Sequence, residues 1–194
     1  MNLTTFINDY DKAETIILLA GKRNVPASDV QKLLDLGKLL ASNSKHMRFR
    51  SGNADGADKY FMDGVAAVDN SRLEVVVPYT GHKKKNNVAS TTYSLDNIDL
   101  VNEPDVTYQS KYHKETKHLV DDCANGKKYN AIHLVKPIIR STVMVIGAKD
   151  ISPSNFGIFY NDLKDPFSGG TGHTINICNK NNIPVIDQRV WFNW

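Results

Sequence analysis

The stretch Ser168-Gly-Gly-Thr-Gly-His-Thr174 decides the fold that this sequence predicts. The segment before it, Asn155-Phe-Gly-Ile-Phe-Tyr160, is typical of a strand, and apolar residues follow at helical spacing up to Asn181. A strand, a glycine turn and a helix leave free backbone N–H groups at the helix N-terminus, where the helix dipole also favours an anion. Glycines let the chain turn tightly and let a ligand approach the backbone closely. The stretch therefore predicts a phosphate-binding turn.

A second loop, Ser51-Gly-Asn-Ala-Asp-Gly-Ala-Asp58, has the same context, with a predicted strand before it and a predicted helix after it. The strand is His46-Met-Arg-Phe-Arg50, and the helix carries an apolar face beginning at Tyr60 and Phe61. Either loop alone is a weak signal. Two such loops in a chain of 194 residues are a more specific indication of phosphate binding.

The first 78 residues alternate between predicted strands and helices. The apolar run Thr15–Ala20 and the β-branched run Leu73–Val77 are typical of strands buried on both faces, and His46–Arg50 lies between them. A helix is predicted after Pro26, with Ser28 and Gln31 at the spacing of a capping box. This order predicts an α/β, Rossmann-like fold in which helices flank a mostly parallel sheet.

In such a sheet, ligands bind beyond the carboxyl ends of the strands. The polar turn Gly21-Lys-Arg-Asn24 and the loops Ser51–Asp58 and Ser168–Thr174 all follow predicted strands, so one site is expected at this edge. The candidate ligand- or phosphate-binding residues are Gly21, Lys22, Arg23, Ser51, Gly52, Asn53, Asp55, Gly56, Asp58, Ser168, Gly169, Gly170, Thr171, Gly172 and His173.

Several of these residue types also have purely structural roles. Lys22 and Arg23 can clamp a phosphate or simply face solvent in a turn. Asp55 and Asp58 can bind ribose hydroxyls, or they can cap the following helix and offset its dipole. His173 can hydrogen-bond a ligand or hold the structure together. These alternatives stay open at the level of sequence.

Residues 79–130 interrupt the alternation of strands and helices. Their polar sequence, which includes Lys83-Lys-Lys85, has no clear periodicity and predicts an insertion or site-covering loop after the third strand. A short surface helix is expected over Lys111–Asp122. The lysines are either a solvated face or a contact for phosphate or nucleic acid. The whole chain, 1–194, is otherwise expected to form one domain.

The last third of the chain is expected to complete the sheet. Ala131–Ile146 combines helical spacing with β-branched residues, and a helix that ends at Gly147 is favoured. Arg140 of this helix can reach the edge of the sheet or pair with an acid. Ile183–Asp187 is predicted as a final short strand, followed by an aromatic tail that covers the core.

Composition narrows the function classes. The chain is 41% hydrophobic and 23% charged, as in ordinary globular proteins, and its net charge of +3 is no nucleic-acid signature. Cys123 and Cys178 lie far apart, and His113, His118 and His133 show no ligand spacing, so no disulfide framework, metal or cofactor is expected. No leader or membrane span is evident, and a cytoplasmic location is expected.

Five segments, in their order along the chain, resemble the SLOG superfamily. They are Ala20-Gly-Lys-Arg23, Arg50-Ser-Gly-Asn-Ala-Asp-Gly-Ala-Asp58, Pro153-Ser154, Gly169-Gly-Thr-Gly172 and Asn182-Ile-Pro-Val185. The match is to the small phage and bacterial branch with an RSGGADGAD-like loop. The superfamily includes the Lonely-guy phosphoribohydrolases and the core of the DNA-processing protein DprA. The resemblance implies a Rossmann-like fold that binds nucleotides or ligands derived from them.

The chain departs from the phosphoribohydrolases at their GGxGTxxE motif. Aligning the glycines places His173 at the threonine and Asn176 at the glutamate. An amide cannot act as a general base or stabilise an oxocarbenium-like centre by its charge. Asp55, Asp58 and Asp187 remain as candidate carboxylates.

The leading hypothesis is a protein that binds a nucleotide-derived ligand, such as an ADP-ribose derivative, without turning it over, as a sensor or sequestering protein. The resemblance would suit a phage protein that captures a defence signal. One alternative is a nucleotide N-glycosidase using Asp55 or Asp58, and a second is single-stranded DNA binding as in DprA. The expected partner is a small molecule. Neither nucleic acid nor a membrane is expected, and a homo-oligomer is compatible with the sequence.

Overall fold

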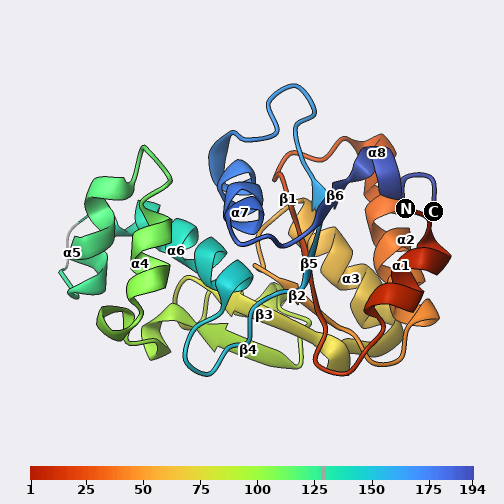
Figure 1. Ribbon diagram of the computed structural model, residues 1–194, viewed down its shortest axis with the longest axis horizontal. Coiled ribbons are helices and arrows are strands. Elements are labelled where there is room, and N and C mark those ends of the chain that lie inside the picture. The colour runs from red at the N-terminus through yellow and green to blue at the C-terminus, as the bar shows by residue number, and fades with distance from the viewer. Residues whose placement is uncertain (128–129) are drawn as a thin grey trace.

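The computed structural model describes residues 1–127 and 130–194 and contains a six-stranded sheet (Figure 1). The strand order is β4-β3-β2-β1-β5-β6, and every pairing between these strands is parallel. The strands are β1 (Ile16–Gly21), β2 (Arg48–Ser51), β3 (Leu73–Val77), β4 (Thr91–Ser94), β5 (Phe156–Tyr160) and β6 (Val185–Asp187). The predicted Rossmann-like α/β class is confirmed.

Helices cover both faces of the sheet. They are α1 (Leu3–Tyr10), α2 (Ala27–Asn43), α3 (Ala57–Asp69), α4 (Pro104–Ser110), α5 (Val120–Ala124), α6 (Ile132–Ile146), α7 (Gly169–Lys180) and α8 (Gln188–Trp191). Side chains of a strand alternate between faces, so Ile17 and Leu19 of β1 pack with α1, α2, α3 and α8. Leu18 and Ala20 pack with α4, α5, α6 and α7. Figure 1 shows these two groups on opposite sides of the sheet.

The strand order creates a crevice at one place. From β1 the chain adds β2, β3 and β4 in one direction, and then it returns to add β5 and β6 on the other side of β1. The loops that follow β1 and β5 therefore lead away from each other. In open parallel sheets this divergence opens a crevice beyond the carboxyl ends of the strands. The fold thus places the predicted site between β1 and β5.

Several predicted elements are confirmed with small shifts of their ends. Strands are present at β1, β2, β3, β5 and β6, and α6 ends before Gly147 as expected, although it contains Pro137. The proposed capping box of α2 is wrong. The helix begins at Ala27 with Pro26 in the capping position, so Ser28 lies in the first turn and makes no cap hydrogen bond.

The segment 79–130 contains more regular structure than the sequence predicts. It includes β4, which pairs with β3 at the edge of the sheet. A single helix over Lys111–Asp122 is wrong, because α4 starts at Pro104, which favours the first turn of a helix, and already ends at Ser110. Residues 128 and 129 lie outside the described part, and an insertion here stays a prediction. Within the described residues, no helix is both long and apolar enough to cross a membrane.

Candidate functional site

A cleft of ≈ 480 Å³ lies at the carboxyl edge of the sheet, between the loops that follow β1 and β5. Of the predicted site residues, those that line it are Gly21, Lys22, Arg23, Asp58, Ser168, Gly169, Gly170 and Thr171. One wall was missed by sequence reasoning. It comes from α6, where Ile138, Arg140 and Met144 face the cleft. Of these residues, sequence analysis had named only Arg140, and it had left open whether Arg140 reaches the edge of the sheet or pairs with an acid.

The N-terminus of α7 is open to the cleft. The backbone N–H groups of Gly169, Gly170 and Thr171 meet no acceptor within the described residues, and the first N–H bonded into the preceding turn is that of Gly172, to the Ser168 carbonyl at 2.9 Å. Ser168 does not cap the helix, because its hydroxyl donates to the Asp165 carbonyl at 3.0 Å. Free donors at the positive end of the helix dipole favour an anion.

Asp58 holds two loops of the cleft together. Its Oδ1 accepts the N–H of Gly21 at 3.1 Å, and its Oδ2 accepts the N–H groups of Gly52 at 3.2 Å and Ala54 at 3.4 Å. The side chain is 5% exposed. Burial raises the pKa of Asp58, while Arg140 and the three N–H donors oppose this shift. The carboxylate of Asp58 thus links the loops after β1 and β2 by hydrogen bonds. This structural role goes beyond an effect on the helix dipole.

Arg140 lies beside this carboxylate with part of its hydrogen-bonding capacity unused. Its Nη1 is 3.7 Å from Asp58 Oδ2 and 3.2 Å from Met144 Sδ. Its buried Nε has no partner among the described residues. Burial lowers the pKa of Arg140, and Asp58 opposes this change. Buried donors are normally satisfied, so an unpartnered guanidinium nitrogen beside a cleft indicates a place for an acceptor.

Gly52 has a different role from the predicted phosphate cradle. A Cβ atom at Gly52 would lie 1.2 Å from Arg140 Nη1 and 2.8 Å from Asp58 Oδ2. The glycine therefore makes room for the guanidinium, and it does not line the cleft. Of the loop after β2, Ala54 and Asp58 line the cleft, and Gly52 supports it indirectly.

Three further residues of this loop also point elsewhere. The Ser51 hydroxyl is buried and donates to the Leu19 carbonyl at 2.8 Å. Asn53 takes a left-handed backbone with φ 52° and donates from Nδ2 to the His82 carbonyl at 3.2 Å. The carboxylate of Asp55 is exposed and pairs with a lysine of the 79–87 segment. The structure does not bring these three side chains into the cleft.

Two predicted glycines are required by close backbone contacts. Gly56 has φ +83°, and a Cβ there would lie 2.1 Å from the Arg23 carbonyl oxygen. A Cβ at Gly172 would lie 2.0 Å from the carbonyl carbon of Phe167. Neither glycine lines the cleft. Both fix the course of loops that do, so their role in the site is indirect.

His173 lies on the buried face of α7 and does not line the cleft, so the predicted ligand contact is corrected. Its Nε2 lies 3.0 Å from Thr142 Oγ1, which also accepts from the Ser110 hydroxyl at 2.9 Å. Its ring contacts that of His113, with 5.7 Å between centroids. Burial, assisted by His113, lowers the pKa of His173 to about 4.

This depressed pKa predicts a loss of stability in mild acid. The unfolded chain binds a proton at His173 near pH 6.5 and the folded protein only near pH 4, so stability is full above pH 6.5 and falls between these values. The expected loss is about 3 kcal/mol. Urea unfolding from pH 7 to pH 4 should show it. His173→Gln, which can still contact Thr142, should lack this slope, while parallel pH curves for the two proteins would contradict the prediction.

Comparison with known proteins adds information on the fold. No family model matches the chain, and no curated protein matches it in sequence. A similar solved structure is that of DNA processing protein A from Helicobacter pylori, reported for its single-stranded DNA binding mode. The TM-score is 0.48 and the identity 15%, over 94% of this chain and 67% of that one. The likeness concerns the arrangement of sheet and helices.

This comparison corrects one sequence-based expectation. Nucleic acid was not expected as a partner, but the similar solved structure is that of a protein described as binding single-stranded DNA. That expectation is therefore withdrawn.

Proposed function

We propose that this chain binds a nucleotide-derived ligand in the cleft, with a phosphate at the N-terminus of α7, as a cytoplasmic sensor or sequestering protein of the SLOG superfamily. The observation that carries the proposal is the set of free N–H groups at Gly169, Gly170 and Thr171 opposite a buried, partly unpartnered Arg140. Lys22 and Arg23 add positive charge to the same cleft. A phage protein that captures a defence signal would need such a site.

The two carboxylates predicted as catalytic candidates, Asp55 and Asp58, favour binding over hydrolysis; Asp162 and Asp165 of the loop after β5 also line the cleft. A glycosidase needs a carboxylate that is free to act as acid, base or nucleophile. Asp58 is engaged by three N–H groups and lies next to Arg140, and Asp55 lies outside the cleft. Asn176 stands where the phosphoribohydrolases have their glutamate. A protein that holds its ligand intact fits these positions better than one that cleaves it.

A charge placed at the helix N-terminus tests this proposal. A Cβ at Gly170 meets no atom within 4 Å, so Gly170→Asp should fold, and its carboxylate should suit the helix dipole while repelling a phosphate. ADP-ribose or AMP at 100 times its dissociation constant should stabilise the wild type by about 2.7 kcal/mol. We expect Gly170→Asp to lose this stabilisation and Gly170→Ala to retain it, as measured by urea unfolding with and without ligand.

The ligand should be analysed by chromatography after each titration. Recovery of intact nucleotide supports a binder, and release of free base would make the chain a glycosidase. If Gly170→Asp binds as well as the wild type, the phosphate does not lie at α7 and the proposal is wrong.

Single-stranded DNA binding is a second candidate, favoured by residues after β3 at the same edge of the sheet. Tyr79 is 46% exposed, and Lys84 and Lys85 are exposed beside it. Stacking on an aromatic ring and contacts from lysine to phosphate are typical of single-strand binding. Titrating an oligonucleotide at rising salt separates the two functions, because DNA binding should weaken steeply while binding of a small nucleotide changes little.

A further inference from the structure

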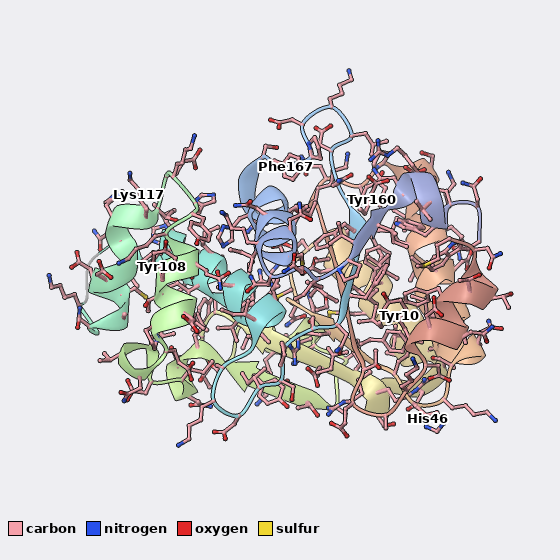
Figure 2. The ribbon with its side chains drawn as sticks, in the orientation of Figure 1. Tyr10, His46, Tyr108, Lys117, Tyr160 and Phe167 are labelled. Atoms are coloured by element: carbon pink, nitrogen blue, oxygen red, sulfur yellow. The ribbon has the colours of Figure 1, made fainter. Side chains whose placement is uncertain are left out.

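The loop between β5 and α7 forms one rim of the cleft and carries an exposed aromatic ring. Asn161, Asp165 and Pro166 of this loop line the cleft. Phe167 lies between the lining residues Pro166 and Ser168 but does not itself line the cleft, and it is 61% exposed. Figure 2 shows it near the start of α7. An exposed phenyl ring leaves a large apolar surface in water, so its position at the rim requires an explanation.

The backbone of Phe167 is held in place although its ring is free. Gly172 of α7 lets the Phe167 carbonyl pack against the first turn, because a Cβ there would lie 2.2 Å from the carbonyl oxygen. Ser168 follows directly in the N-cap position, fixed by its hydrogen bonds to the Asp165 carbonyl. The ring thus projects from a defined point next to the free N–H groups, and it is not the tip of an unsupported loop.

Chain geometry places the ring close to the predicted phosphate. Phe167 and Gly169 are two residues apart, so their Cα atoms are separated by at most about 7 Å. In a nucleotide, a ribose spans a comparable length between the phosphate and the base. A base attached to a phosphate at the α7 N-terminus can therefore reach the Phe167 ring.

We propose that Phe167 is a specificity-determining residue that stacks on the base of the bound nucleotide. This inference rests on the proposed function, because the phosphate at α7 sets the distance to the base. The ring contributes contact with any flat aromatic group and no hydrogen bond. Phe167 therefore selects ligands that carry a base over sugar phosphates that lack one, while polar residues of the rim are left to distinguish one base from another.

The test compares two nucleotides that carry a base with a sugar phosphate that lacks one. Binding of AMP, ADP-ribose and ribose 5-phosphate is measured by calorimetry with the full chain and with Phe167→Ala, Phe167→Tyr and Tyr108→Ala. Phe167→Ala should weaken binding of the two nucleotides by about 5- to 150-fold, the range for loss of one stacked base, and leave ribose 5-phosphate unchanged. Phe167→Tyr should bind as the wild type does. Tyr108 is 62% exposed and lies on α4, a helix that contributes no residue to the cleft, so Tyr108→Ala is the matched control.

Each other outcome overturns the inference in a recognisable way. Equal weakening of all three ligands by Phe167→Ala would show that the ring supports the loop without contacting a base. Unchanged nucleotide binding, or wild-type affinity for AMP no higher than for ribose 5-phosphate, would exclude stacking while leaving the proposed function intact. Failure of the wild type to bind any of the three would overturn the proposed function together with this inference.

Discussion

Replacing Asp58 by alanine is expected to lower the free energy of unfolding by about 4 kcal/mol and to abolish nucleotide binding. The carboxylate accepts the N–H groups of Gly21, Gly52 and Ala54, and Arg140 lies next to it. Without it, three backbone donors and a buried cation lose their acceptor at once. Removing one partner of a buried charged pair costs more than the pair contributes, because the remaining charge is left uncompensated.

Asp55→Ala is the matched control for this prediction. Asp55 belongs to the same loop, but its side chain is 67% exposed and it forms an ion pair with Lys83. Loss of such a pair costs at most about 1 kcal/mol. Urea unfolding and ADP-ribose titration of both variants measure the contrast. Equal stability of the two variants would show that the link Asp58 makes between the two loops does not stabilise the fold.

Asp58 also illustrates how far sequence reasoning reaches in this protein. The three loops were predicted to meet, because parallel strands bring their carboxyl ends to one edge and each loop follows a predicted strand. Which loop residues line the cleft and which ones support it could not be predicted. It depends on contacts such as Gly21 with Asp58 and Gly52 with Arg140, which join positions far apart in the chain. A glycine that admits a ligand and one that admits an arginine look the same in sequence.

The elements that sequence reasoning missed also depend on contacts between distant parts of the chain. β4 is a short edge strand with half-buried, polar residues, so Thr91–Ser94 lacks the apolar pattern that revealed β1 and β3. Its pairing with β3 stabilises it, and this is a tertiary contact. Likewise, α6 was predicted correctly as a helix. No local sequence pattern, however, shows which of its faces lines the cleft.

Arg50→Met is expected to cost about 3–5 kcal/mol of unfolding free energy. The guanidinium of Arg50 in β2 is 1% exposed and is fully used. Its Nε and Nη2 contact Glu74 Oε1 at 2.6 and 2.5 Å, and its Nη1 donates to the carbonyls of Met144 at 3.0 Å and Ser152 at 2.7 Å. The residue thus ties β2 and β3 to the C-terminal turn of α6. Methionine fills a similar volume but leaves these acceptors without a donor.

Two further variants separate charge from packing in this prediction, again by urea unfolding. Arg48 pairs with the same Glu74 at 2.9 Å but is 37% exposed, so Arg48→Met should cost at most about 1 kcal/mol. In Arg50→Met the buried carboxylate of Glu74 keeps only Arg48 as an ion-pair partner, so replacing Arg50 and Glu74 together by methionine should regain part of the stability. The recovery should stay incomplete, because the carbonyls of Met144 and Ser152 still lack their donor. A double variant no more stable than Arg50→Met would show that lost packing and hydrogen bonds, and not the weaker compensation of the Glu74 charge, account for the cost.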